Sequence, residues 1–245
     1  MGNKLVLGTM RLHERTQDVG AWVQFFIEAH RLGVRKLHSS SEYESYPLLK
    51  EILCYLKKNH PEIEFEHIVK LAEPSFNDAG YESGRLTEKV NDYLLDLQTS
   101  RLAVIQWMWR LSLKEDELRI QNFLEASSGL SSEVSELKSG SKIEQVMCFP
   151  YSVSFANTAI QQNFIDGLVV YRNVLETEYD ESLKAATRLG KESYIIRPLA
   201  AGKALSEAGK PARELYNWAL DHEGVVGAIV SISKPHHLRD LASNS

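Results

Sequence analysis

The sequence predicts one α/β domain of the (β/α)8-barrel class, with shortened loops, spanning residues 1–245. Short apolar runs recur along the whole chain, and nearly every run is followed by a longer stretch with helical spacing. The runs are continuous rather than alternating, which is typical of strands that are buried on both faces of a parallel sheet. Eight such units in 245 residues match a closed barrel near its minimum length.

The predicted strands are bounded on each side by polar or turn-forming residues. In chain order they cover residues 5–9, 36–40, 67–71, 102–107, 145–149, 167–171, 194–199 and 226–232.

The predicted helices have apolar residues on one face and recognisable ends. The first ends at Gly33, which is a favourable C-terminal stop. The second begins at Pro47, where a first helical turn tolerates proline. The fourth opens with Ser112 and Glu115, a capping-box pattern. The helices cover residues 19–32, 47–58, 86–97, 114–124, 154–163, 180–189, 211–221 and 235–242.

An open, doubly wound sheet is the alternative architecture. The chain lacks a Gly-x-Gly-x-x-Gly sequence after its early strands, and such a fold uses those glycines to bring the backbone close to a pyrophosphate. This favours the barrel. The segment 127–141 is rich in serine and glycine, and we expect a surface turn region there because small polar residues favour turns.

The composition excludes several classes of partner and location. The formal net charge is −5 and the basic residues are scattered, so we expect no nucleic-acid partner. The sequence has no apolar run long enough to span a membrane and no signal-type N-terminal segment, so we expect no membrane contact and a cytoplasmic protein. Cys54 and Cys148 each lie in an apolar run and are expected to be reduced core thiols.

The carboxyl ends of the strands are where a barrel of this class holds its catalytic groups. Four candidate side chains lie there: His38 and Tyr43 at the second strand, Lys70 near the end of the third, and Gln106 in the fourth. A lysine inside an apolar strand needs a partner, and its pKa shifts readily. A tyrosine can act as a general acid. Glutamine can donate to a carbonyl oxygen but transfers no proton.

Two further features have alternative interpretations. Trp107 and Trp109 lie at the end of the fourth strand, where they are either a substrate-stacking wall or part of the core. His236 and His237 are adjacent, with no Cys, Asp or Glu cluster in the sequence around them to complete a site, so we expect no metal.

Taken together, several segments resemble the aldo-keto reductase superfamily almost from end to end. Residues 7–12 are similar to its opening Leu-Gly-Thr-Met strand, and residues 27–37 to its next helix and strand. Residues 40–43 resemble its catalytic tyrosine loop, and 198–202 its Pro-Leu-x-x-Gly sequence. Residues 229–241 resemble the segment that binds the cofactor phosphate.

The resemblance implies reversible hydride transfer between NADPH and the carbonyl group of a small molecule. It implies that Tyr43 is the proton donor and that Lys70 lowers the pKa of this tyrosine. Two positions depart from the family pattern, which has an aspartate where His38 stands and a histidine where Gln106 stands. Without the aspartate, Lys70 lacks its usual partner, while Gln106 can still polarise a carbonyl.

The cofactor contacts follow from the same resemblance. NADPH is the expected cofactor, and NADH is the alternative because the phosphate segment drifts from the family sequence. The implied contacts are Ser152, Pro198, Leu199, Ser233, Lys234 and His237.

Three functions therefore compete. The first is an NAD(P)H-dependent oxidoreductase with an altered set of four catalytic residues. The second is a barrel that has lost turnover and acts as a binding or regulatory protein. The third is a non-redox acid–base enzyme that uses His38, Tyr43 and Lys70. Trimmed loops can expose apolar surface, which a second copy of the chain can cover.

Overall fold

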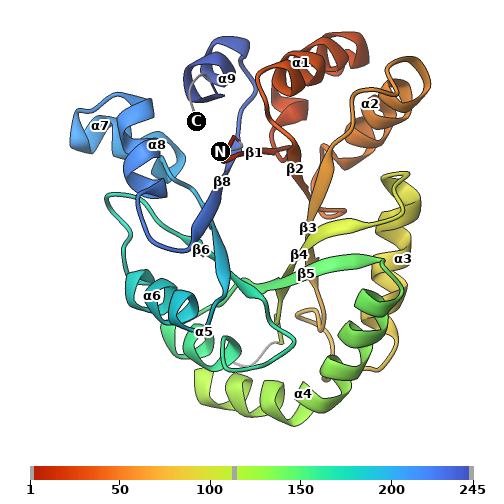
Figure 1. Cartoon of the computed structure of the whole chain (residues 1–245), viewed down its shortest axis with the longest axis vertical. Coiled ribbons are helices and arrows are strands. Elements are labelled where there is room, and N and C mark those ends of the chain that lie inside the picture. Colours follow the sequence, from red (N-terminus) through yellow and green to blue (C-terminus); the bar gives the residue numbers. More distant parts are fainter. Residues whose placement is uncertain (1–2, 112–114, 243–245) are drawn as a thin grey trace.

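The computed structural model describes residues 3–111 and 115–242, and its strands form one closed parallel barrel in the order β1 to β8 (Figure 1). This confirms the predicted barrel and rules out the open sheet, because β1 pairs with β8 as well as with β2. The strands are β1 (Leu5–Gly8), β2 (Lys36–Ser39), β3 (Glu66–Ala72), β4 (Leu102–Met108), β5 (Ile143–Cys148), β6 (Gly167–Tyr171), β7 (Glu192–Ile196) and β8 (Val225–Ser231).

The helices surround the barrel as an outer layer (Figure 1). Each predicted helical segment contains a helix, and the structure adds α7 and two short 3-10 turns, Leu12–Glu14 and Ala200–Gly202. The helices are α1 (Val19–Arg31), α2 (Tyr46–Asn59), α3 (Arg85–Asp96), α4 (Asp116–Ser139), α5 (Val153–Ala159), α6 (Asp180–Arg188), α7 (Lys203–Ala208), α8 (Ala212–Leu220) and α9 (Pro235–Ala242).

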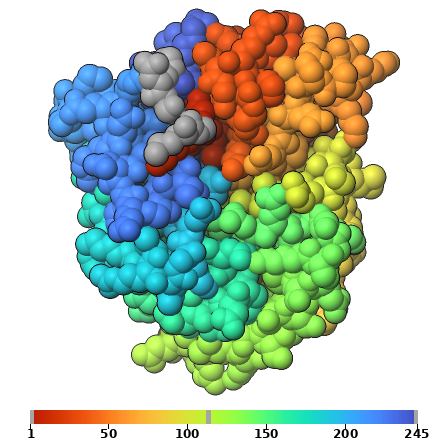
Figure 2. Space-filling view, viewed as in Figure 1, coloured from red at the N-terminus to blue at the C-terminus, as the bar shows by residue number. Residues whose placement is uncertain are grey.

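The prediction of a surface turn region over 127–141 is wrong, because most of this segment continues helix α4, which runs along one end of the molecule in Figure 2. Phe123, Leu130 and Val134 recur at helical spacing and are buried, so tertiary packing outweighs the weak helix propensity of the small residues. A Cβ atom on Gly129 would lie 2.8 Å from the Tyr81 ring, so the glycine allows close packing there. Ser112, the predicted cap, lies outside the described residues.

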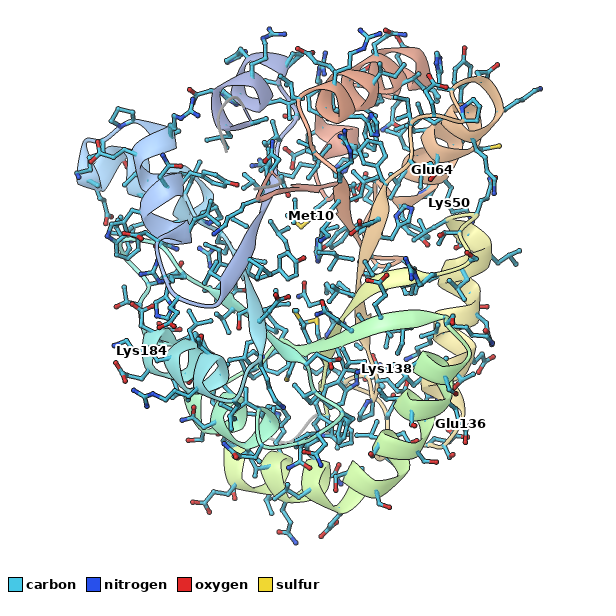
Figure 3. All side chains as sticks on the ribbon, viewed as in Figure 1. Met10, Lys50, Glu64, Glu136, Lys138 and Lys184 are labelled. Carbon is cyan, nitrogen blue, oxygen red and sulfur yellow. The ribbon has the colours of Figure 1, made fainter. Side chains whose placement is uncertain are left out.

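Two apolar layers hold the barrel together. The larger layer lies between the strands and the helices, and a smaller cluster that includes Ile68, Val104 and Val169 fills the barrel interior. Successive residues of a strand face opposite sides, so in β4 the neighbours Ile105 and Trp107 join the outer layer and Gln106 faces inward. The inward positions at the strand ends are those that a site can use. Figure 3 shows Met10, just after β1, within the ring of strands.

The two cysteines differ in their surroundings. Cys148 is buried and Cys54 is exposed, and both are free thiols. The prediction of a core thiol is therefore wrong for Cys54, which lies on the outer face of α2. Burial raises the pKa of the Cys148 thiol. Within the described ranges, no helix combines the length and the apolar character needed to cross a membrane.

Candidate active site

The strand register brings three of the predicted site residues together at one end of the barrel. His38 of β2 is paired in register with Ile68, two residues before Lys70 of β3, and Lys70 is in register with Gln106 of β4. Tyr43 lies in the turn between β2 and α2, where its backbone N–H donates to the carbonyl of Ser40 at 3.0 Å. The Lys70 ammonium lies 5.2 Å from the centre of the Tyr43 ring.

His38 and Gln106 are hydrogen-bonded to each other. The distance between His38 Nε2 and Gln106 Oε1 is 2.7 Å, and both residues are buried. Burial, with the nearby Lys70 charge as a smaller cause, lowers the pKa of His38 to about 4. The imidazole is therefore neutral at physiological pH, and Nε2 carries the hydrogen that Oε1 accepts. The amide nitrogen of Gln106 is left as a hydrogen-bond donor.

Tyr43 is half-buried and stays protonated. Burial raises the pKa of its hydroxyl group, Tyr93 and Glu42 raise it further, and only the Arg110 guanidinium opposes them among the main causes. The expectation of a lowered pKa is wrong for Tyr43, because burial is the largest cause of the shift and Lys70 is not among its main causes. Tyr43 can still donate a proton, as a weaker acid than free tyrosine.

Glu42 and Arg110 are site residues that the sequence analysis missed. Glu42 Oε2 lies 2.8 Å from Lys70 Nζ, and the Arg110 guanidinium binds both Glu42 oxygens, with Nη2 to Oε2 at 2.9 Å. The Arg110 hydrogen bond is the main reason that the pKa of Glu42 falls to about 2. The available signal was the position of a glutamate directly before Tyr43 and an arginine just beyond the fourth strand.

Aromatic side chains border this cluster. Arg110 Nε donates to the Tyr151 hydroxyl group at 3.2 Å, and its guanidinium lies 5.5 Å from the centre of the Phe76 ring. The Phe149 ring packs edge-on against the rings of Tyr151 and Tyr171. A cavity of about 350 Å³ adjoins Glu42 and Lys70 on the side of α3. The site therefore combines a charged cluster with a border of aromatic side chains.

The prediction of Trp107 as a substrate wall is wrong. This residue is 1% exposed, its ring packs against Trp109 and Phe123, and its indole N–H donates to the backbone carbonyl of Glu73 at 2.8 Å. Trp107 directly follows Gln106 in β4, and successive residues of a strand face opposite sides. Trp107 therefore faces the helices rather than the barrel mouth. Core packing, the alternative interpretation, holds for both tryptophans.

Ser152 lies at the start of α5. Its hydroxyl group donates to Asp116 at 2.6 Å and accepts from the backbone N–H of Phe155 at 2.9 Å. Its one hydrogen is therefore used within the protein, and toward a cofactor Ser152 can only accept. The implied cofactor contact at Ser152 stays a prediction.

The other implied cofactor residues lie in two loops and at the start of α9. Pro198 and Leu199 follow β7 in a turn whose backbone is strained, because Arg197, Ala200 and Ala201 all have left-handed φ angles, between 48° and 56°. Such strain recurs at ligand-binding turns.

The second loop joins β8 to α9. Lys234 in this loop and His237 in the first turn of α9 are exposed, and the Ser233 carbonyl accepts from Arg15 Nη1 at 3.1 Å. Burial, with the charges of His236 and Lys234, lowers the pKa of His237. The loop thus gathers basic side chains from both ends of the chain. Over the residues that the structure describes, no group of three His, Cys, Asp or Glu side chains could hold a metal.

Comparison with known proteins identifies the architecture. No family model and no curated protein sequence matches the chain. Among solved structures, a Pseudomonas aeruginosa protein described as an aldo-keto reductase superposes with a TM-score of 0.74 at 19% identity, covering 98% of this chain and 88% of the other.

Two other structures agree. An aldo-keto reductase from Bacillus halodurans in its holo form gives a TM-score of 0.72 at 16% identity, covering 98% of this chain and 85% of the other. One from Klebsiella pneumoniae in complex with NADPH gives 0.70 at 16% identity, covering 98% and 84%. Over nearly its whole length, the chain has the barrel fold of the aldo-keto reductases.

Proposed function

We propose that the chain is a divergent member of the aldo-keto reductase superfamily, which reduces an aldehyde or ketone with NADPH. The observation that carries this proposal is the convergence of Tyr43, Lys70, His38 and Gln106 at one mouth of the barrel. Each of these residues stands at the position that the family pattern uses, although His38 and Gln106 differ from it in type. The solved complex of a Klebsiella pneumoniae relative with NADPH supports the choice of cofactor.

The chemistry of the cofactor-facing residues fits a phosphate-bearing ligand at one end. Arg15 and Lys234 provide positive charge beside Ser233, and the strained turn at Pro198 and Leu199 lies on the same side of the barrel wall, after β7. Cations and hydroxyl groups are the side chains that bind phosphate best. When bound, the reduced nicotinamide supplies the hydride.

In this reaction the protein supplies a hydrogen bond to the carbonyl oxygen and a proton. The Gln106 amide, fixed by His38, donates to the carbonyl oxygen and withdraws electron density from the carbonyl carbon. Tyr43 then delivers its hydroxyl proton to the oxygen that becomes the alcohol. The Lys70 ammonium, 5.2 Å from the ring centre, stabilises the tyrosinate that remains. Phe149 and Tyr171 offer apolar surface that keeps water away.

A binding barrel without turnover is the second candidate, and one observation favours it. The raised pKa of Tyr43 makes it a weaker proton donor than a free tyrosine. The two candidates agree on cofactor binding and differ in turnover.

Consumption of NADPH in the presence of a panel of aldehydes and ketones separates them. We expect turnover that falls at least about 100-fold in Tyr43→Phe, the usual contribution of a general acid. Tyr55→Phe is the matched control, since Tyr55 is exposed on α2, and it keeps full activity. Full activity in Tyr43→Phe would show that another group donates the proton. Saturable binding with no turnover of any carbonyl would favour the binding barrel.

A further inference from the structure

Lys70 is a cation in an apolar strand, and it requires a compensating negative charge. Its side chain is 19% exposed, and its β3 neighbours Val69 and Leu71 are buried. His38, in the adjacent strand β2, is neutral at physiological pH and offers no negative charge. Among the ion pairs of the described residues, Lys70 has one carboxylate, that of Glu42 at 2.8 Å.

Glu42 is itself held in place by Arg110. The guanidinium grips both carboxylate oxygens, a two-point contact that fixes the orientation of the group as well as its charge. Arg110 is 8% exposed, and its backbone N–H donates to the Pro74 carbonyl at 3.1 Å. A third contact, from Nη2 to the sulfur of Met108 at 3.4 Å, anchors the guanidinium to the end of β4.

We propose that Glu42 is the positioning residue of this site: its carboxylate, held by Arg110, fixes the Lys70 ammonium beside Tyr43. For its catalytic consequence the proposal rests on the function proposed above. It gives a reason for the charge of position 42, which directly precedes the proton donor and joins the β2–α2 turn to the ends of β3 and β4.

The charges that face Glu42 determine how its replacement affects the protonation of Lys70. Lys70 approaches from β3 and Arg110 from beyond β4, while Tyr43 adjoins it in the chain. Two cations thus share one carboxylate. Replacing Glu42 by glutamine leaves the two cations facing each other, which favours loss of the Lys70 proton. Replacing Arg110 by glutamine leaves Lys70 with the whole of the Glu42 charge, which favours retention of the proton.

The first test measures the reactivity of Lys70 toward a low dose of acetic anhydride, with modification quantified by mass spectrometry. Only the deprotonated amine reacts, and Lys184, on the surface of α6 (Figure 3), is the internal reference. We expect modification of Lys70 to be about tenfold faster in Glu42→Gln, since a tenfold change in the deprotonated fraction corresponds to one pKa unit. Glu42→Asp, which keeps the charge, and Arg110→Gln show no acceleration.

The matched control is Glu44→Gln. Glu44 lies two positions away in the same turn with its side chain 80% exposed, and its partner is His13. This variant leaves Lys70 reactivity unchanged. Equal Lys70 reactivity in Glu42→Gln and the unaltered protein would overturn the proposal. Acceleration in Glu42→Asp as large as in Glu42→Gln would also overturn it, because loosening of the turn rather than charge would then be the cause.

The second test is kinetic. We expect kcat to fall at least about tenfold in Glu42→Gln with KM for NADPH unchanged, and partial recovery in Glu42→Asp. An unchanged kcat in Glu42→Gln would contradict the positioning role. Should the protein lack turnover altogether, the proposed function fails, while the Lys70 reactivity still decides whether Glu42 fixes the ammonium.

Discussion

His38 Nε2 lies 2.7 Å from Gln106 Oε1 and joins the ends of β2 and β4 across the intervening strand β3. These are the two positions at which the chain departs from the aldo-keto reductase pattern, and the structure makes them partners. A buried neutral imidazole needs an acceptor for its N–H, and the glutamine carbonyl oxygen supplies one. The pair also determines which end of the amide is free to face a substrate.

The buried imidazole predicts acid lability. The pKa of His38 is about 4 in the folded protein and about 6.5 in an unfolded chain. The unfolded state therefore binds more protons between these values, so stability is complete above pH 6.5 and is lost as the pH falls toward 4.

We expect this residue to account for about 3 kcal/mol of lost stability over that range. Urea unfolding of His38→Asn across this pH range measures the effect, with the exposed His236→Asn as control. If His38→Asn lost as much stability on acidification as the unaltered protein, His38 would not be the cause of the acid lability.

The start of α3 depends on a carboxylate from another helix. Glu133 of α4 accepts from the backbone N–H of Thr87 at 2.7 Å and from the Tyr81 hydroxyl group at 2.6 Å. The residue before α3 is Gly84, which has no side chain to cap it.

Glu133→Ala leaves two donors without an acceptor, and we expect a loss of about 2 to 4 kcal/mol in the free energy of unfolding. Glu136→Ala, an exposed change on the same helix (Figure 3), changes this free energy by less than about 0.5 kcal/mol. Similar denaturation midpoints for both variants would show that the cap is dispensable.

The core position of Trp107 predicts a stability defect without a binding defect. Trp107→Phe removes the indole bond to the Glu73 carbonyl and leaves a void beside Phe123, so we expect a loss of about 2 to 3 kcal/mol. NADPH affinity stays the same. Trp218→Phe is the control, since Trp218 is 37% exposed. A weaker affinity in Trp107→Phe with unchanged thermal stability would restore the interpretation as a substrate wall.

The basic loop after β8 predicts the cofactor preference. Lys234→Ala removes a cation beside Ser233, and we expect the Kd for NADPH to rise about tenfold, which corresponds to one charge-assisted contact. The Kd for NADH is unaffected because NADH lacks the additional phosphate. Lys184→Ala, on α6, is the control. An equal rise in the Kd values for NADPH and NADH would show that Lys234 contacts a phosphate that both cofactors contain.

The fold was predictable because strands that are buried on both faces are recognisable in the sequence as runs of apolar residues. Strands such as Leu102–Met108 are apolar except for Gln106, and Gly33, with a left-handed φ angle, closely follows helix Val19–Arg31. The predicted fourth helix was shorter than α4 because the serines and Gly129 in its second half have low intrinsic helix propensity. Its helical state depends on packing by Leu130 and Val134, which becomes visible only once the neighbouring elements are in place.

The site was predictable in part. Strand ends located His38, Lys70 and Gln106, because register in a parallel barrel aligns those positions. The role of Glu42 depends on its ion pair with Arg110. The two residues are far apart in the sequence, so their contact becomes visible only once the barrel is closed. The direction of the Tyr43 pKa was missed for the same reason, since it is set by burial and by these charges together.

Titration of the purified protein with NADPH, and separately with NADH, tests the central claim most directly. Quenching of tryptophan emission reports binding, and Trp107 and Trp109 lie in and just beyond strand β4 of the barrel wall. We predict saturable binding at micromolar concentrations, tighter for NADPH than for NADH. An absence of binding of either cofactor up to millimolar concentrations would contradict the assignment as a nicotinamide-dependent reductase.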